Sequence, residues 1–279
     1  MPLPIIDSRH AASQADLVRL FHQTEERWTA HLGETHSLDI GTAYSNRDFA
    51  TVYDANNIRD VALPDGMTPE AALAMVSAHY EQRQTRCAYW VMNASSPESA
   101  TRPMAEYLLL NGYRANGADI MLLTDAPRRV VAEAANLKII PARASFRHAR
   151  MLAEESARRW NAPRLVDAFM RHMDDPHWDM LLALRDGVAA GCIGVLAVGE
   201  IGRVEQFYVA EAFRGQGIGQ TLLRRILEIC ARSLFRHVML WVLPDNSAAV
   251  KLYAKVGFER IGQFTAHLAP GVQSHPRPG

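Results

Sequence analysis

The chain has 279 residues, 48% of them hydrophobic, which is enough for one large domain or two ordinary ones with buried cores. Basic and acidic residues balance to a net charge of zero, which argues against nucleic-acid partners and against attraction to acidic membranes. No apolar run is long enough to span a bilayer and no signal peptide is recognisable, so we expect a cytoplasmic protein. The three cysteines are far apart and set in apolar surroundings, which predicts free thiols instead of disulfides or a metal site: Cys87, Cys192 and Cys230.

The first half of the sequence predicts a mixture of helices and strands after a loose start of about twelve residues. Ser13 is a suitable N-cap for a helix whose apolar residues share one face, namely Leu17, Leu20, Phe21, Trp28 and Leu32. We then expect strands over 36–44 and 49–61, a helix from Thr68 to about Arg86, and a strand over 87–92. A polar loop over 93–102, a helix over 104–111 and a strand pair over 118–124 complete this half.

The second half repeats the pattern, beginning with a strand over 137–140 and helices over 145–161 and 165–173. Strands over 178–184 and 188–198 form a predicted hairpin, because Arg185-Asp186-Gly187 is a strong turn signal. The remaining prediction is a strand over 204–210, a helix after Gly219, a strand over 237–243, a helix over 247–256 and a strand over 258–267. The tail from Pro270 is rich in Pro and Gly and is predicted to be disordered.

The most informative stretch joins the 204–210 strand to the amphipathic helix that follows it. Its sequence, Arg214-Gly215-Gln216-Gly217-Ile218-Gly219, lies where the helix begins. Helix N-termini present unpaired N–H groups and partial positive charge, and glycines let an anion approach those groups closely. Arg214 adds a cation, so the stretch predicts an anion cradle, which is suited to a phosphate.

Two motifs resemble the GNAT superfamily of N-acetyltransferases. Arg214–Gly219 is similar to the family's Q/R-x-x-G-x-G/A pyrophosphate signature and follows a Phe-Tyr-Val strand, as it does in that family. About thirty residues later, 241–253 followed by Gly257-Phe258 resembles the second signature, a strand, an Asn-capped helix carrying Leu-Tyr and a Gly-Phe turn. There is no G-K-[ST] sequence for a P-loop, and a dinucleotide fold would carry its glycines near the start of a βαβ domain.

The resemblance implies an α/β fold with two GNAT-like domains, each a mixed twisted sheet flanked by helices. The halves resemble repeats, since Trp90-Val91 and Trp241-Val242 each precede a short helix and a glycine turn. We expect a degenerate copy over 1–135, an acetyltransferase domain over 136–270 and a disordered tail over 271–279. In the first copy the cradle is replaced by 63–68, which contains Asp65 and no arginine.

The resemblance also implies a set of cofactor-binding residues. Main-chain groups of the strand before the cradle would bind the pantetheine arm and thioester of acetyl-CoA, while the cradle would hold the pyrophosphate. Asn246 would cap a helix and could also contact the cofactor. The implied set is Phe207, Tyr208, Val209, Arg214, Gly215, Gln216, Gly217, Ile218, Gly219 and Asn246, with no metal ligand among them.

Two residues are candidates for proton transfer. By resemblance Tyr253 would be the general acid for the departing thiolate, since a phenol with a pKa near ~10 keeps its proton at neutral pH. The alternative is an aromatic ring that only packs in the core. Glu205 would be the base, acting directly or through water, and strand alternation puts it on the side of Phe207 and Val209. Its alternative role is a structural partner of Arg203.

These features predict acetyl-CoA-dependent N-acetylation of a primary amine by the second half of the chain. The alternative is a non-catalytic acyl-CoA-binding module or sensor. A small amine, an aminoglycoside and a protein N-terminus all remain open as acceptors, and an oligomer is possible. The acceptor pocket is expected from Trp160, His172, His177 and Trp178, with part of the first copy, whereas His237 and His267 are expected to be structural.

Overall fold

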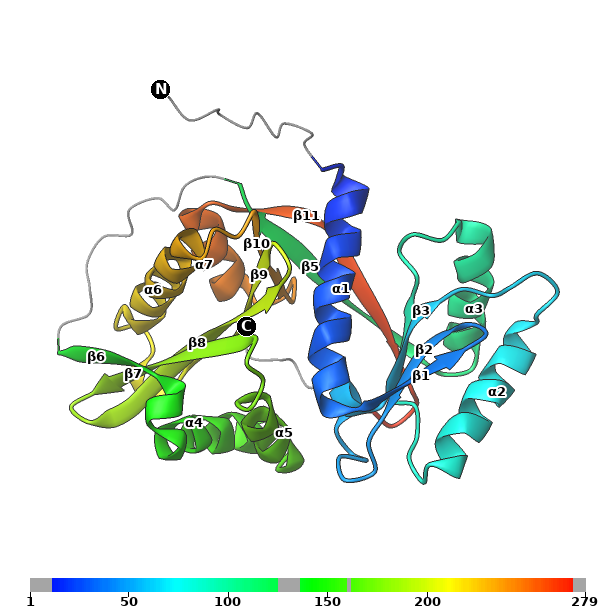
Figure 1. The fold of residues 1–279 in the computed structure, drawn as a ribbon, viewed down its shortest axis with the longest axis horizontal. Coiled ribbons are helices and arrows are strands. Elements are labelled where there is room, and N and C mark those ends of the chain that lie inside the picture. The colour runs from blue at the N-terminus through cyan, green and yellow to red at the C-terminus, as the bar shows by residue number, and fades with distance from the viewer. Residues whose placement is uncertain (1–11, 125–135, 160–161, 273–279) are drawn as a thin grey trace.

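The computed structural model describes residues 12–124, 136–159 and 162–272, and within these ranges eleven strands form one sheet flanked by helices (Figure 1). The strands are β1 (Glu34–Leu38), β2 (Gly41–Ser45), β3 (Asn57–Val61), β4 (Tyr89–Met92), β5 (Arg114–Leu123), β6 (Leu137–Pro141), β7 (Trp178–Arg185), β8 (Val188–Val198), β9 (Ile201–Val209), β10 (His237–Val242) and β11 (Phe258–Leu268). The helices are α1 (Gln14–Leu32), α2 (Pro69–Gln82), α3 (Glu98–Leu110), α4 (Phe146–Arg159), α5 (Arg164–His172), α6 (Ile218–Arg232) and α7 (Ser247–Val256). Short 3₁₀ turns are η1 (Tyr53–Ala55), η2 (Ala142–Ala144) and η3 (Glu211–Phe213).

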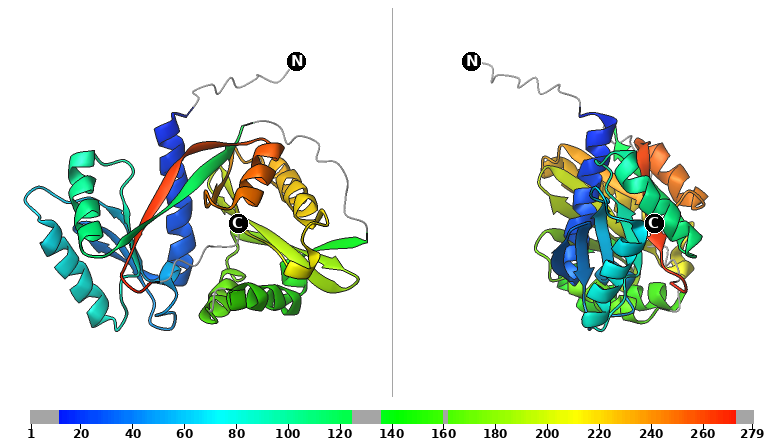
Figure 2. Two further views of the ribbon diagram at one scale, coloured as in Figure 1. Left: turned by 180° about the vertical axis from the view of Figure 1, so that it is seen from behind. Right: turned by 90° about the vertical axis from the view of Figure 1, so that its right-hand side faces the viewer.

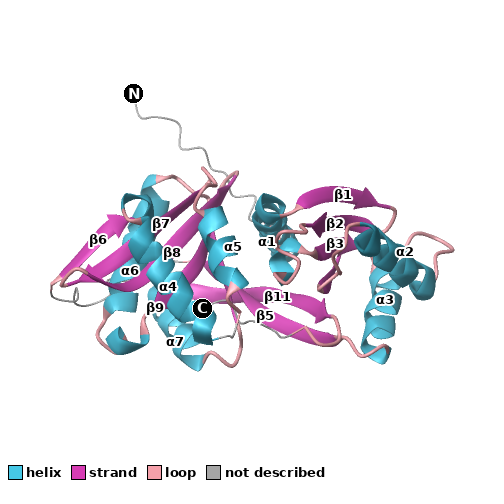
Figure 3. Ribbon diagram, turned by 90° about the horizontal axis from the view of Figure 1, so that it is seen from below, coloured by secondary structure: helices cyan, strands magenta, loops and turns pink. Residues whose placement is uncertain are grey.

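The two halves of the chain exchange their last strands. The strand order is β1-β2-β3-β4-β11-β5-β10-β9-β8-β7-β6, so β11 pairs with β4 of the first half and β5 pairs with β10 of the second. Strands β5 and β11 also pair with each other, antiparallel, from Arg114 opposite Leu268 to Leu123 opposite Phe258. Figure 3 shows this pair as the bridge between the two halves. Each half of the sheet is therefore completed by a strand from the other half.

This exchange bears on the predicted domains. The fold class, α/β with a mixed sheet and flanking helices, is confirmed, but the halves form one continuous sheet. The boundary predicted between 135 and 136 touches the segment 125–135, which lies outside the described residues, so the division into two domains stays a prediction. Of the predicted tail, Gly271 and Val272 are described, and the Val272 carbonyl accepts a 2.7 Å hydrogen bond from Arg114.

Helix α1 crosses the centre of the molecule between the two halves (Figures 1 and 2). Ser13 caps it as predicted, in a capping box with Asp16. Phe21 packs with Ile120 of β5 and Met239 of β10, so this helix from the first half covers strands that belong to both. Helix α1 therefore contributes to the core beneath β9 and β10 although it lies far from them in sequence.

Most of the predicted elements are confirmed, including α2, α4 to α7 and the β7–β8 hairpin. The hairpin turns at Asp186 (φ 51°) and Gly187 (φ 79°), the left-handed pair that a two-residue turn requires. Four predictions of elements were wrong. The 36–44 stretch is a hairpin of two strands, and 49–56 holds η1 instead of a strand. The predicted loop 93–102 already contains the first turns of α3, because Pro97 at the N-cap and Glu98 start that helix earlier.

The fourth wrong prediction is the strand pair over 118–124, which is a single ten-residue strand, β5. Since β5 is hydrogen-bonded to β10 on one side and β11 on the other, its length is set by two partners from the second half. No local signal in the sequence reports such partners.

Within the described ranges, none of the helices combines the length and the apolar character needed to cross a lipid bilayer.

Candidate active site

Strands β9 and β10 pair only at their first residues and then separate. The parallel ladder joins 237–239 to 201–203, whereas β9 continues to Val209 and β10 to Val242. On its other side β9 remains paired with β8 from Ile201 to Val209. The main-chain groups of Val204–Val209 that face β10 are thus left without a ladder partner on that strand. This opening can accept an extended ligand as an additional hydrogen-bonding partner.

A β-bulge interrupts β9 at Gln206, whose φ of 55° is unusual for a residue other than glycine. The bulge breaks the alternation of side chains that was predicted to put Glu205 on the side of Phe207 and Val209. Phe207 and Val209 pack in the core beneath α6, whereas Glu205 contacts Arg203, which lies against α1. The predicted side of Glu205 was therefore wrong, because one extra residue in the strand resets the alternation.

The glycine loop forms the N-terminus of α6, as predicted. Gly215 (φ 72°) and Gly217 (φ 77°) have left-handed backbones, and a Cβ added at either position would meet no atom within 4 Å. Gly217 is the N-cap and offers no side chain, and the first backbone bond of the helix runs from Thr221 N–H to the Gly217 carbonyl. The amides before Thr221 are thus not used by the helix and can bind an anion.

The remaining cradle residues connect the loop to the end of β9. Arg214 is exposed, donates a 3.1 Å hydrogen bond to the Val209 carbonyl, and holds its guanidinium carbon 5.8 Å from the Tyr208 ring centre. Gln216 is exposed and accepts a hydrogen bond from Arg185. Ile218 is buried, and a Cβ on Gly219 would lie 3.3 Å from the Phe207 ring. The cradle therefore lies directly beside the separated part of β9.

The equivalent helix of the first half has a different N-terminus. The Thr68 hydroxyl of α2 accepts a hydrogen bond from the Ala71 amide, and Pro69 at the first helical position has no N–H. One of the first amides of this helix is thus occupied and another is missing, which leaves fewer groups to bind a phosphate. This difference supports the expectation that the first copy lacks the cradle.

Glu205 ends a chain of buried charges in which the Arg203 pair was the alternative that the sequence offered, whereas Glu25 and Arg59 carried no sequence signal. Its carboxylate lies 3.0 Å from the Arg203 guanidinium, and Arg203 also bonds Glu25 of α1. Glu25 in turn lies 3.1 Å from Arg59 of β3. All four side chains are buried, and two positive groups alternate with two negative ones. Because unpaired charges are costly in an apolar interior, each member fixes the position of its neighbours.

Tyr253 lies on α7 beside the opening between β9 and β10. Its buried ring contacts Phe207 (centroids 6.2 Å apart) and Phe258 (5.9 Å). Burial, and to a lesser extent the Glu205 carboxylate, raises the pKa of Tyr253 above its ordinary value. None of the described residues hydrogen-bonds to its hydroxyl. The Tyr253 ring therefore packs in the core, as the alternative to a catalytic role predicted. It also places a phenol with a raised pKa near Glu205.

Three further predicted residues can be placed. Asn246 caps α7, as predicted, by accepting a 3.3 Å hydrogen bond from Ala249 N–H. His237 and His267 lie in β10 and β11, and burial lowers the pKa of each.

The described residues contain no group of three or more His, Cys, Asp or Glu side chains arranged to hold a metal ion. All three cysteines are free, and burial raises the pKa of each thiol to about 12.

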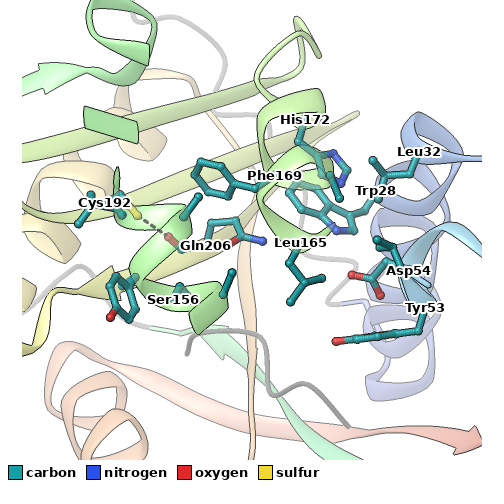
Figure 4. Close-up of a pocket in the computed structure, with 16 residues that line it drawn as sticks. Trp28, Leu32, Tyr53, Asp54, Ser156, Leu165, Phe169, His172, Cys192 and Gln206 are labelled. Carbon is teal, nitrogen blue, oxygen red and sulfur yellow. Dashed lines mark hydrogen bonds between the residues drawn. The ribbon is translucent and has the colours of Figure 1, made fainter. Parts of the chain in front are cut away.

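A pocket lies between the two halves at the bulge of β9 (Figure 4). Gln206 and Tyr208 of β9 line it, together with His172 of α5, which stacks on Trp28 with ring centres 3.4 Å apart. Trp178 packs behind that pair, and His177 binds Asp175 instead. Trp160 lies outside the described residues. Of the predicted acceptor residues, the structure thus brings His172 into the pocket, with Trp28, Tyr53 and Asp54 from the first half.

Comparisons with known proteins agree with this geometry. Residues 145–258 match the sequence model of the acetyltransferase (GNAT) family. N-alpha-acetyltransferase RimI of Mycobacterium tuberculosis is 35% identical over 99 residues, which cover 34% of this chain and 61% of that protein. A putative ribosomal protein bS18-alanine N-acetyltransferase of Bacillus subtilis is 29% identical over 107 residues, covering 38% of this chain and 71% of that protein. A GCN5-related N-acetyltransferase from Kribbella flavida has a similar fold over 91% of this chain and 95% of its own, with a TM-score of 0.61 and 14% identity.

The similarity to the acetyltransferase (GNAT) family therefore covers residues 145–258, the part of the chain whose motifs predicted that class of enzyme. The matched segment runs from the start of α4 to the start of β11 and contains the cradle, Glu205 and Tyr253. The chain spans about 61% of the length of the M. tuberculosis relative. The similarity to the K. flavida structure, in contrast, extends over both halves of the chain and concerns the fold alone.

Proposed function

We propose that this protein transfers the acetyl group of acetyl-CoA to a primary amine. The observation that carries the proposal is the arrangement of three features in one place: an uncapped glycine cradle, the separated part of β9, and Tyr253 against Phe207. The cradle and Arg214 bind the pyrophosphate, and Phe207, Tyr208 and Val209 present main-chain groups to the pantetheine arm and thioester.

The chain's own residues then move two protons. The amine nitrogen attacks the thioester carbonyl, and its proton passes to Glu205, directly or through water. As the carbon–sulfur bond breaks, Tyr253 gives its phenolic proton to the thiolate. The raised pKa of Tyr253 supports this role, because the phenol stays protonated until the thiolate forms. Arg203 pairs with the Glu205 carboxylate, so a proton taken by Glu205 weakens a buried ion pair during the reaction.

A non-catalytic acyl-CoA-binding module remains the second candidate, because the Arg203 pair is also the structural role that Glu205 would have without catalysis. The test is acetyl-CoA consumption by the full chain against a panel of amines, read as release of free thiol and as acetylated product by mass spectrometry. Thiol release that depends on one amine supports the enzyme. Tight acetyl-CoA binding with no thiol release from any amine would favour the module.

We further propose one cofactor per chain. The occupied N-terminus of α2, with Thr68 bonded to Ala71 and Pro69 without an N–H, supports the absence of a second site. Calorimetric titration with acetyl-CoA measures the stoichiometry directly. A value of two would mean that the first half also binds the cofactor.

A further inference from the structure

The pocket at the bulge of β9 has a volume of about 70 Å³, and its walls come from both halves. The second half supplies β9, α4 and α5, while the first half supplies α1 and the η1 segment. The walls are mainly apolar and aromatic, lined by Trp28, Leu32, Val52, Tyr53, Asp54, Leu152, Ala153, Ser156, Ala157, Leu165, Ala168, Phe169, His172, Cys192, Gln206 and Tyr208. Among these lining residues, Asp54 alone carries a carboxylate and none carries a guanidinium or ammonium group.

Asp54 is well placed to act on a ligand in this pocket. It is buried, with 8% of its surface exposed, and comes from η1 of the first half. Figure 4 shows its carboxylate entering the pocket from the side opposite Gln206, with the Tyr53 ring next to it. The Trp28 ring lies on the same wall. A carboxylate beside aromatic faces is a favourable environment for a cation, through direct charge attraction and cation–π contact.

The position of Asp54 is fixed by the same network that holds Glu205. The Tyr89 hydroxyl donates to the Asp54 carboxylate at 3.5 Å, and Arg59 donates to the Tyr89 oxygen. Arg59 pairs with Glu25, which leads through Arg203 to Glu205. The carboxylate on the pocket wall and the candidate base are therefore joined by a buried chain of polar contacts. Such a chain preserves the separation between them when a ligand binds.

Gln206 supplies the opposite wall. Its backbone is held in the left-handed region by the bulge, and its amide points into the pocket (Figure 4). Its side-chain amide makes no hydrogen bond to any residue that the structure describes. The backbone carbonyl of Gln206, in contrast, accepts a hydrogen bond from the Cys192 thiol. Strained backbone of this kind persists where the surrounding structure holds it, and here it directs a polar group at the ligand space from the residue that follows Glu205 in β9.

On the basis of the proposed function, we propose that the acceptor is a compact molecule with two positively charged groups, such as a diamine. One amine lies at the Gln206 side of the pocket, the side nearest to Glu205 along β9, and there it loses its proton and is acetylated. The second remains charged and is bound by Asp54 with the rings of Trp28 and Tyr53. Asp54 is thus a specificity-determining residue that the first half of the chain contributes to the site of the second half.

The test measures ligand binding to the full chain by calorimetry in the presence of CoA, which cannot transfer an acetyl group. Three probes differ only at one end: 1,4-diaminobutane, 4-amino-1-butanol and n-butylamine. We expect the diamine to bind more than about tenfold more tightly than the other two, because only it has a second cation for Asp54. Equal binding of the three probes by the unaltered protein, or no binding of any, would overturn the inference.

Variants localise the effect. Asp54→Asn keeps the size of the side chain and should reduce the preference for the diamine to less than about threefold, while acetyl-CoA affinity stays unchanged. The matched control is Asp65→Asn, an exposed carboxylate in a turn of the same half, which should retain the full preference. A diamine preference that remains in Asp54→Asn would mean that a residue other than Asp54 binds the second cation. If Asp54→Asn does not fold, the three probes with the unaltered protein still test whether the site prefers a ligand with two positive charges.

This experiment also separates the inference from the proposed function. Diamine selectivity without any thiol release from acetyl-CoA would leave the binding site in place and remove the enzyme activity. Thiol release with a monoamine and no diamine preference would retain the enzyme and overturn the role of Asp54.

Discussion

The carboxylate of Glu205 lies 3.0 Å from the guanidinium of Arg203, and both side chains are buried. Arg203 is held in turn by Glu25 of α1, so a residue from the first half of the chain helps to position the candidate base in the second. This relationship explains why the two halves cannot be treated as independent. It also gives the first of the following predictions.

Replacing Arg203 by methionine should lower the free energy of unfolding by about 3–5 kcal/mol, because two carboxylates would stay buried with one cation fewer. Urea denaturation measures this change. The control is Arg225→Met on α6, where an exposed pair with Glu228 is broken and the cost should stay below about 1 kcal/mol. Similar small effects of both substitutions would contradict the structural importance of the buried chain.

The cradle is tested by Arg214→Glu, which puts a repulsive charge beside the proposed pyrophosphate site. We expect the Kd for acetyl-CoA to rise by more than about tenfold, measured by calorimetry. Arg232→Glu makes the same charge change in the last turn of α6 and should leave the Kd nearly unchanged. If both variants bound acetyl-CoA like the unaltered protein, the phosphate site would have to lie elsewhere.

Tyr253→Phe removes one hydroxyl and keeps the ring contacts with Phe207 and Phe258. The single-turnover rate should fall by roughly 10²–10⁴-fold, the contribution expected of a positioned general acid, with little change in Tm or acetyl-CoA affinity. Tyr107→Phe on α3 serves as a control and should keep the full rate. An undiminished rate in Tyr253→Phe would exclude this residue from proton transfer, and a Tm that fell together with the rate would indicate a structural hydrogen bond.

The raised pKa of Tyr253 also predicts a pH dependence. A phenol is active as an acid below its pKa, so a raised pKa moves the loss of activity to higher pH. We expect no loss from this group between about pH 7 and its ordinary pKa of ~10. The measurement is the single-turnover rate against pH for the unaltered protein. A decrease centred below pH ~9 that disappears in Tyr253→Phe would contradict the raised pKa.

The strand exchange predicts that residues 136–279 do not fold cooperatively alone. Without the first half, β10 and β11 lose their partner β5, and Arg203 loses Glu25. Thermal unfolding followed by circular dichroism should show no sharp transition for this segment. Co-expression with a separate chain of residues 1–135 should restore one, since the exchanged strands can pair between chains. A cooperative transition in the isolated segment would show that its core does not need β5.

Much of the site could be predicted from the sequence because its signals are local. The cradle depends on glycines and an arginine at a helix start, and the cap of α7 depends on Asn246 alone. The β7–β8 turn likewise depends on Asp186 and Gly187. In each case the backbone conformation is decided by residues within a few positions of one another, so the pattern of residue types is sufficient.

Only the tertiary structure decided which distant residues meet. The sequence placed Glu205 on the strand before the cradle, but the bulge at Gln206 and the buried chain through Arg203 decide where its carboxylate lies. The pocket residue Asp54 carries no sequence signal, because it reaches β9 through the exchange of strands and the path of α1. Pairing between strands far apart in the chain depends on the burial of whole faces and on strand order, which local residue patterns do not encode.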